Sequence, residues 1–173
     1  MNKKIMYIIT ILSTAVLLFL DQIAKYLAVL HLKGQAAIPI IKNVFELQYL
    51  ENQGAAFGIM QGKKTFFVIG TLIFLVIVGI FYHNIPLTKR FTPIRIVAVL
   101  IIAGAIGNMI DRVVHQYVID FFYFKLINFP IFNVADIYVV VACILFILLM
   151  LFYYKEEELG QIFPFMKSKK AEE

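Results

Sequence analysis

The order of apolar and polar residues along the chain predicts four membrane-spanning helices. Each is an apolar run with charged residues only near its ends, and the four cover about residues 5–30, 65–82, 94–112 and 136–154. A helix needs about 20 predominantly apolar residues to cross the hydrocarbon core, with about 17 to 25 tolerated. The second and fourth runs meet this length directly, and the first and third meet it if their polar ends stay helical.

The segments between these runs are predicted to form two outer loops, about residues 31–64 and 113–135. In the first, "NVFELQYLE" alternates apolar and polar side chains, which is typical of a half-buried strand. We therefore expect a small β-sheet at the outer surface. The second is rich in Phe and Tyr, which suit the headgroup level, and we expect a loop or short helix there. Residues from about 155 to 173 are expected to be a solvated tail.

Composition places the chain among membrane proteins. Its 173 residues are 62% hydrophobic, with a mean hydropathy of +0.87, and we expect a single membrane domain of helical class over residues 1–173. The one cysteine, Cys143, lies inside an apolar run, so a disulfide framework is excluded. In such a protein the net charge of +5 reports on orientation and on anionic headgroups. We therefore expect membrane lipids as partners and no nucleic acid.

The basic residues lie mostly on one side of the four-span arrangement. By the positive-inside rule this side is cytoplasmic, so both termini should be cytoplasmic. The first run lacks a small-residue cleavage site and continues its helical pattern past residue 20, so we expect a retained anchor. The basic residues on the cytoplasmic side are Lys3, Lys4, Lys89, Arg90, Arg95, Lys155, Lys167, Lys169 and Lys170.

The same topology brings all four aspartates of the chain to one membrane level. Asp21 lies near the outer end of the first span and Asp111 at the outer end of the third. Asp120 lies in the following outer loop, and Asp136 begins the fourth span. Ionisable residues at membrane depth are costly to keep and indicate function by default. We therefore expect a polar site near the outer face.

Two helical motifs supply polar residues to this outer layer, and each also has a purely structural explanation. "DQIAK" places Asp21 and Lys25 one turn apart, where they can form an ion pair. "GNMIDR" places Asn108, Asp111 and Arg112 on one helix face, next to small residues that permit close helix packing.

Three further motifs lie in or next to the outer loops. Asn52 and Gly54 of "NQGAAFG" suit a turn that needs glycine. Asn133 of "FNVAD" suits a helix N-cap, with Asp136 in the first turn. Asp120 of "VIDF" taken alone is explained as an exposed loop residue. These separate explanations do not account for the gathering of so many polar residues at one level.

The chemistry available to this layer is carboxylate chemistry. The two serines, Ser13 and Ser168, and Cys143 lie away from it, and the three histidines lack metal-ligand spacing, so we expect neither a metal nor another cofactor. Two neighbouring aspartates cannot both ionise cheaply, so such a pair shares a proton. One can take a proton from water while the other donates to a carbonyl oxygen, which is how an aspartic hydrolase cuts an amide.

Two other functions remain open on the residues alone. A proton-coupled transporter also uses intramembrane carboxylates, but it predicts polar residues through the depth of the bundle, whereas spans two and four are almost free of them. A non-enzymatic assembly subunit predicts that Asp→Asn changes alter stability or partner binding without affecting any turnover.

The five motifs, in this order and joined by four spans, resemble the lipoprotein signal peptidases, the type II bacterial signal peptidases. The third motif departs mildly, since Ala103-Gly104 stands where the family usually has two glycines. The resemblance implies four transmembrane helices with a small extracytoplasmic sheet and an aspartic endopeptidase of the bacterial plasma membrane. Its catalytic pair matches Asp120 and Asp136. The supporting or substrate-binding residues match Asp21, Lys25, Asn52, Gly54, Asn108, Asp111, Arg112 and Asn133.

The resemblance also implies the substrate and the inhibitors. Diacylglyceryl-modified prolipoproteins are cut just before the lipidated cysteine, which releases the signal peptide. Globomycin-type antibiotics inhibit the family by occupying this site. The outer position of the aspartates agrees with an active site near the outer face, which a lipid-bearing substrate enters sideways from the bilayer.

Overall fold

The computed structural model describes residues 2–54 and 63–163. Among them are four helices that are long and apolar enough to cross a membrane, as the apolar runs predict. They are α1 (Lys3–Leu32), α2 (Lys64–Asn84), α3 (Thr92–His115, preceded by a 3-10 turn, η2, at Lys89–Phe91) and α4 (Val134–Leu148, continued by a π-helical turn, η4, at Leu149–Tyr153).

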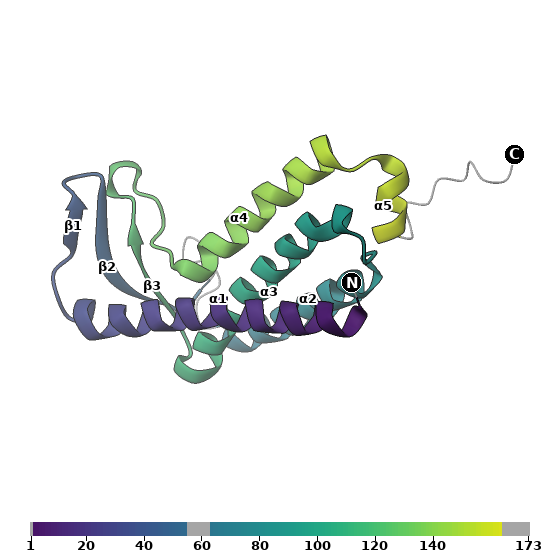
Figure 1. Cartoon of the computed structure of the whole chain (residues 1–173). Helices are drawn as coiled ribbons and strands as arrows, with labels where there is room; N and C mark the ends of the chain where they lie inside the picture. The colour runs from purple at the N-terminus through teal and green to yellow at the C-terminus, as the bar shows by residue number, and fades with distance from the viewer. Residues whose placement is uncertain (1, 55–62, 164–173) are drawn as a thin grey trace, which may run out of the picture.

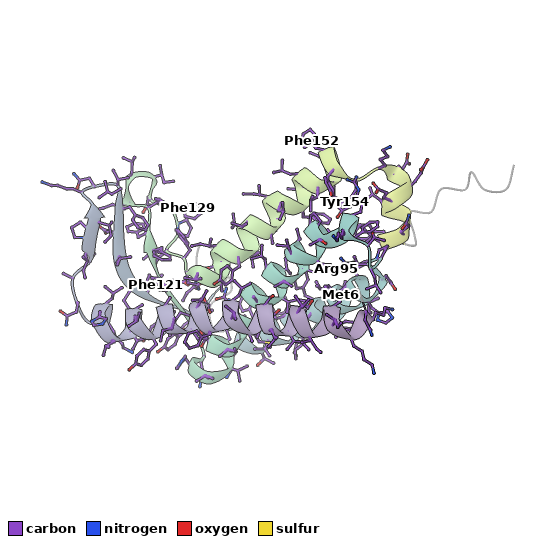
Figure 2. All side chains as sticks on the ribbon, in the orientation of Figure 1. Met6, Arg95, Phe121, Phe129, Phe152 and Tyr154 are labelled. Carbon is purple, nitrogen blue, oxygen red and sulfur yellow. The ribbon has the colours of Figure 1, made fainter. Side chains whose placement is uncertain are left out.

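Apolar side chains cover the outside of this bundle. Phe152, for example, is 80% exposed and points away from the other helices (Figure 2). Exposing so large an apolar surface to water is unfavourable, whereas contact with lipid tails is not. The fold class is therefore the predicted one, a membrane helical bundle with a small sheet.

Helix α3 is the central helix and contacts α1, α2 and α4. Small residues allow these close approaches. A Cβ atom on Gly104 would lie 2.6 Å from the carbonyl oxygen of Ala135 in α4, and one on Gly107 would lie 2.6 Å from Oδ2 of Asp21 in α1. Gly104 and Gly107 therefore bring three of the four helices together next to the polar residues.

A three-stranded antiparallel sheet lies at one end of the bundle, in the order β1-β2-β3 (Figure 1). Strands β1 (Ile38–Ile41) and β2 (Phe45–Asn52) come from the first loop, where alternation predicts a strand. Strand β3 (Val118–Tyr123) comes from the second, followed by a 3-10 turn, η3, at Lys125–Ile127. The second loop thus contains a strand that the sequence did not predict.

The opposite end of the molecule holds the start of α1 and a short helix, α5 (Glu156–Ile162) (Figure 1). Ile162 is 1% exposed and belongs to an apolar cluster with Met6, Tyr82 and Phe91. The segment after α4, expected to be a solvated tail, therefore packs against the bundle as far as the structure describes it. Residues 164–173 of that tail lie outside the described residues.

Candidate active site

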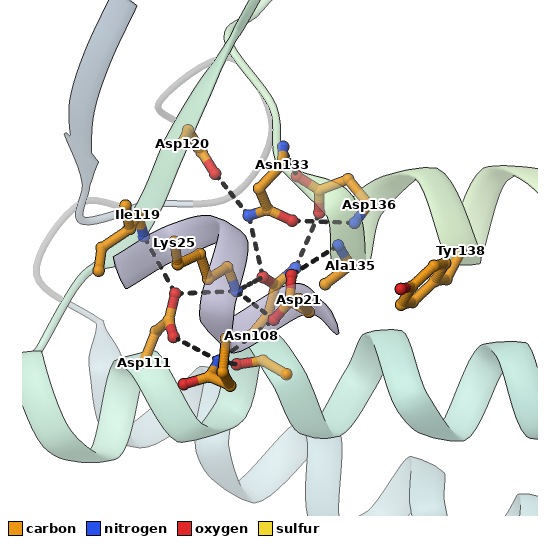
Figure 3. A network of polar contacts seen from close by, with 12 residues as sticks. Asp21, Lys25, Asn108, Asp111, Ile119, Asp120, Asn133, Ala135, Asp136 and Tyr138 are labelled. Atoms are coloured by element: carbon orange, nitrogen blue, oxygen red, sulfur yellow. Dashed lines mark hydrogen bonds and ion pairs between the residues drawn. The ribbon is translucent and has the colours of Figure 1, made fainter. Parts of the chain in front are cut away.

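The four aspartates come from four different elements and lie in one polar network at the sheet end of the bundle (Figure 3). Asp21 belongs to α1, Asp111 to α3, Asp120 to β3 and Asp136 to the first turn of α4. Asp21, Asp111 and Asp120 are at most 1% exposed. The convergence predicted from topology is therefore present in the structure.

Asp120 is held by two asparagine side chains. Nδ2 of Asn52 donates to its Oδ2 at 2.9 Å, and Nδ2 of Asn133 donates to its Oδ1 at 2.6 Å. Burial, and then the negative charge of Asp136, raise the pKa of Asp120 to about 7, although the asparagine hydrogen bonds act in the opposite direction. This carboxyl group therefore exchanges its proton near neutral pH.

Asp136 is held at the start of α4 by a capping box. Its Oδ2 accepts a hydrogen bond from the backbone N–H of Asn133 at 3.1 Å, and its own N–H donates to Oδ1 of Asn133 at 3.0 Å. Nδ2 of Asn108 donates to the other oxygen, Oδ1, at 2.8 Å. The N-cap role expected for Asn133 is present, together with its bond to Asp120.

Asn108 and Asn133 join the two aspartates. Nδ2 of Asn133 donates to Asp120 and, at 3.1 Å, to Oδ1 of Asn108. The same Oδ1 accepts from Nζ of Lys25 at 3.1 Å, so the amide of Asn108 must direct its Nδ2 toward Asp136. The donors that reach Asp120 and Asp136 in this network are neutral amides.

Asp21 and Asp111 instead share a cation. Nζ of Lys25, which is 1% exposed, lies 2.9 Å from Oδ2 of Asp21 and 2.9 Å from Oδ2 of Asp111. Gln22 adds hydrogen bonds of 3.1 Å to both carboxylates. Gln22 was not among the residues predicted from the sequence, although its position three residues before Lys25 puts it on the same side of the helix.

This ionic cluster also reaches the backbone next to each member of the other pair. Oδ1 of Asp21 accepts from the N–H of Ala135, beside Asp136, at 2.9 Å. Oδ2 of Asp111 accepts from the N–H of Ile119, beside Asp120, at 3.1 Å. Asp21 and Asp111 therefore fix the backbone positions from which Asp120 and Asp136 extend (Figure 3).

Arg112 and Gly54 lie at the edge of the network. The guanidinium of Arg112 lies 4.8 Å from the ring centroid of Phe67 and donates to the carbonyl oxygen of Gly54 at 3.1 Å. The N–H of Gly54 donates to Oδ1 of Asn52 at 3.0 Å, which orients that amide toward Asp120. The rest of the "NQGAAFG" motif, residues 55–58, lies outside the described residues.

A cavity of about 650 Å³ opens beside Asp120 and Asp136. Polar groups line one end, and apolar side chains from the loop before α4 and from α4 itself line the rest. Phe129, at the edge of this cavity, is 46% exposed (Figure 2). The lining residues include Asn52, Asn108, Arg112, Phe124, Phe129, Phe132 and residues 139–141.

Such an arrangement can activate water between two carboxyl groups. Among the residues that the structure describes, no group of three or more His, Cys, Asp or Glu side chains is placed to hold a metal ion. A carboxyl pair that shares one proton can act as base and acid in turn. The apolar wall of the cavity suits a substrate with long hydrocarbon groups.

Comparison with known proteins gives a consistent result. A family model described as signal peptidase (SPase) II matches residues 13–152. The lipoprotein signal peptidase of Clostridium novyi is 44% identical over 133 residues, which cover 74% of this chain and 87% of that protein. The lipoprotein signal peptidase of Clostridioides difficile is 42% identical over 134 residues, which cover 78% and 88%. A bacterial membrane enzyme solved by the in meso method at 2.3 Å is 33% identical with a TM-score of 0.72, covering 82% of this chain and 87% of that one.

Proposed function

Since the chain belongs to the signal peptidase II family, the lipoprotein signal peptidases, we propose that it is an aspartic endopeptidase whose catalytic residues are Asp120 and Asp136. Membership makes it a membrane protease that removes signal peptides from prolipoproteins. The proposal adds the catalytic pair and the bond that is cut, which is the peptide bond just before the diacylglyceryl-bearing cysteine.

One observation carries the proposal: the carboxyl groups of Asp120 and Asp136 line one cavity, and both accept hydrogen bonds from neutral amide groups. With the pKa of Asp120 raised to about 7, the pair retains one proton near neutral pH. The ionised carboxylate takes a proton from water, which attacks the scissile carbonyl carbon, while the protonated carboxyl donates to the carbonyl oxygen. Return of a proton to the amide nitrogen then breaks the C–N bond and releases the two peptides.

The supporting residues keep this pair in position. Asn52, Asn108 and Asn133 orient the two carboxyl groups through the hydrogen bonds described above. The Asp21–Lys25–Asp111 cluster accepts hydrogen bonds from the backbone N–H groups next to Asp120 and Asp136 and so holds that backbone in place. Arg112 lines the cavity and donates to the carbonyl oxygen of Gly54, and Asn52, Asn133 and Arg112 hold the substrate backbone.

The shape and position of the cavity support a lipid-bearing substrate. Its apolar wall along α4 can hold the diacylglyceryl chains and the signal peptide, so the prolipoprotein enters sideways from the bilayer. Globomycin-type inhibitors occupy the same cavity. In the topology predicted from the sequence, most basic residues lie on the side of the termini, which supports cytoplasmic termini and an active site near the outer face of the bacterial plasma membrane.

The test is cleavage of a diacylglyceryl-modified prolipoprotein by the purified protein in detergent. Asp120→Asn and Asp136→Asn should each reduce the rate by about 10² to 10⁴-fold, the usual effect of losing a general acid or base. Glu51→Gln, the same type of change on β2 but outside the pair, should retain activity. Thermal unfolding of each variant checks that it is folded.

Two results would contradict the proposal. If the folded Asp120→Asn and Asp136→Asn variants still cut the substrate, these two residues are not catalytic. If the wild-type protein leaves a verified substrate intact, the proposal is wrong, and a proton-coupled transporter or an assembly subunit becomes the better explanation.

A further inference from the structure

A second cavity, of about 600 Å³, lies between α1 and α3 at the end of the bundle opposite the sheet. Met6 and Ser13 of α1 and Arg95 of α3 line it, with Tyr82 of α2, and none of its lining residues lines the active-site cavity. Along α1 it extends from Met6 to Leu17, which is about 17 Å of helix. One leaflet contributes about 15 Å of hydrocarbon, so the groove matches the depth of a single leaflet.

Arg95 is the charged residue of this groove, and it is 6% exposed (Figure 2). Its two terminal nitrogens donate to the backbone carbonyl oxygens of Thr88 and Pro86, which are neutral acceptors. Its Nε has no hydrogen-bond partner among the described residues. Within that part of the chain, no carboxylate forms an ion pair with Arg95, whereas nearby Arg90 pairs with Glu158 at 2.8 Å.

A buried cation without a counter-ion is unfavourable, so the site is electrostatically complementary to an anion. Lys3 adds to this positive charge, because it lies three residues before Met6 on the same side of α1. The walls of the groove are apolar side chains on the lipid-facing surface, such as Ile9 and Ile96, which are both 50% exposed.

We propose that this groove binds an anionic phospholipid of the leaflet at the end where α1 begins. The phosphate diester lies against Arg95, and an acyl chain extends along the groove between α1 and α3. A soluble anion would leave the apolar walls without a partner, and a zwitterionic lipid would bring its own cation to Arg95. An anionic lipid satisfies both the charge and the apolar surface.

The proposal is independent of the catalytic one, because it rests on the groove and Arg95 alone. The test is native mass spectrometry of the purified protein with phosphatidylglycerol and phosphatidylcholine that carry the same acyl chains. Wild type should retain one phosphatidylglycerol with at least about fivefold preference, the contribution of one basic residue close to an anionic lipid.

Two variants should abolish this preference by different routes. Arg95→Gln removes the charge, and Ser13→Phe fills the groove while leaving Arg95 in place. Lys89→Gln is the matched control, since it removes one exposed positive charge at the same end of the molecule and should keep the preference. If Arg95→Gln fails to fold, Ser13→Phe still decides the question.

Equal retention of phosphatidylglycerol by wild type, Arg95→Gln and Ser13→Phe would overturn the proposal in favour of non-specific lipid contact. A parallel thermal-unfolding series with inorganic phosphate and glycerol 3-phosphate separates the two sources of a phosphate group. If these soluble anions raise the Tm as much as phosphatidylglycerol does, the site binds a soluble anion and the lipid assignment is wrong.

Discussion

The four aspartates form two pairs that lie close together but have different partners. Asp21 and Asp111 share the cation of Lys25, and this cluster is almost fully buried. Asp120 and Asp136 receive hydrogen bonds from the neutral amides of Asn52, Asn108 and Asn133. The first pair therefore contacts a cation, whereas the second contacts neutral donors, and burial raises the pKa of its member Asp120 to about 7.

This difference agrees with the proposal that one pair holds the backbone in position and the other pair carries out the reaction. The pair bound to Lys25 also accepts the backbone N–H groups of Ala135 and Ile119, so its fixed charge is used for position. The pair bound by amides faces the cavity and can exchange a proton with substrate or water. Changes at Lys25, Asp120 and Gly107 test this division between the two pairs.

Removing the shared cation should have the largest effect on stability. Lys25→Met leaves Asp21 and Asp111 as buried carboxylates without their common partner, which we expect to lower the free energy of unfolding by about 3–5 kcal/mol. Activity should fall as well, since both carboxylates hold backbone beside the proposed catalytic pair. Thermal unfolding and prolipoprotein cleavage measure the two effects.

Two further variants make this test specific. Asp111→Asn added to Lys25→Met should restore part of the stability, because it removes one of the unpaired charges. Lys33→Met breaks an exposed ion pair with Glu51 and should leave stability nearly unchanged, because solvent screens such a pair. Equal effects of Lys25→Met and Lys33→Met would show that the buried cluster has no special role.

The pH dependence of stability should distinguish Asp120. With its pKa raised from 3.8 to about 7, the folded protein keeps this proton between about pH 4 and 7, where the unfolded chain releases it. The wild-type stability that comes from this proton is therefore present at low pH and lost as the pH rises toward 7. Asp120→Asn does not titrate, so its stability relative to wild type should rise over this interval, by at most about 4 kcal/mol.

Tm values of wild type and variant between pH 5 and 8 measure this trend. Glu51→Gln is the control: Lys33 holds the pKa of Glu51 below its usual value, so its difference from wild type should stay constant over the same range. A constant difference for Asp120→Asn would mean that Asp120 carries no exchangeable proton. The catalytic proposal adds that wild-type kcat/KM should fall above about pH 7 as the pair loses its proton.

The helices and the meeting of the aspartates could be predicted from the sequence for simple physical reasons. Apolar runs of about 20 residues have few alternatives to a membrane span, and four spans place Asp21, Asp111 and Asp136 at the same end. Alternation over Phe45–Tyr49 predicts a strand, although Glu46 on its polar face is buried and pairs with Lys125.

Other features depend on tertiary contacts that leave little trace in the local pattern. Strand β3 has no alternation, because residues 118–121 are all buried, and a loop or short helix is therefore what the sequence predicts there. The hydrogen bonds of Asp21 to Ala135 and of Asp111 to Ile119 are made to backbone N–H groups, which carry no sequence signal. Gln22 carries a faint signal, as a polar residue between Asp21 and Lys25 in an otherwise apolar helix.

A smaller effect is expected from a methyl group placed between the two pairs. In Gly107→Ala the new Cβ would lie 2.6 Å from Oδ2 of Asp21 and 3.3 Å from Cβ of Ala135. The Asp21 carboxylate must then move, which weakens its bonds to Lys25 and to the N–H of Ala135 and shifts the turn that carries Asp136. We expect a loss of about 1–3 kcal/mol in the free energy of unfolding, together with a fall in kcat.

Gly70→Ala and Gly79→Ala in α2 are matched controls, because a Cβ atom at either position meets nothing within 4 Å. Alanine favours the helix over glycine by up to about 1 kcal/mol, so these variants should be neutral or slightly stabilised and fully active. If Gly107→Ala behaves like Gly79→Ala in both stability and kcat, the proposed catalytic pair does not depend on the position of Asp21. If kcat falls only in Gly107→Ala, the ionic pair sets the geometry in which the amide-bound pair works.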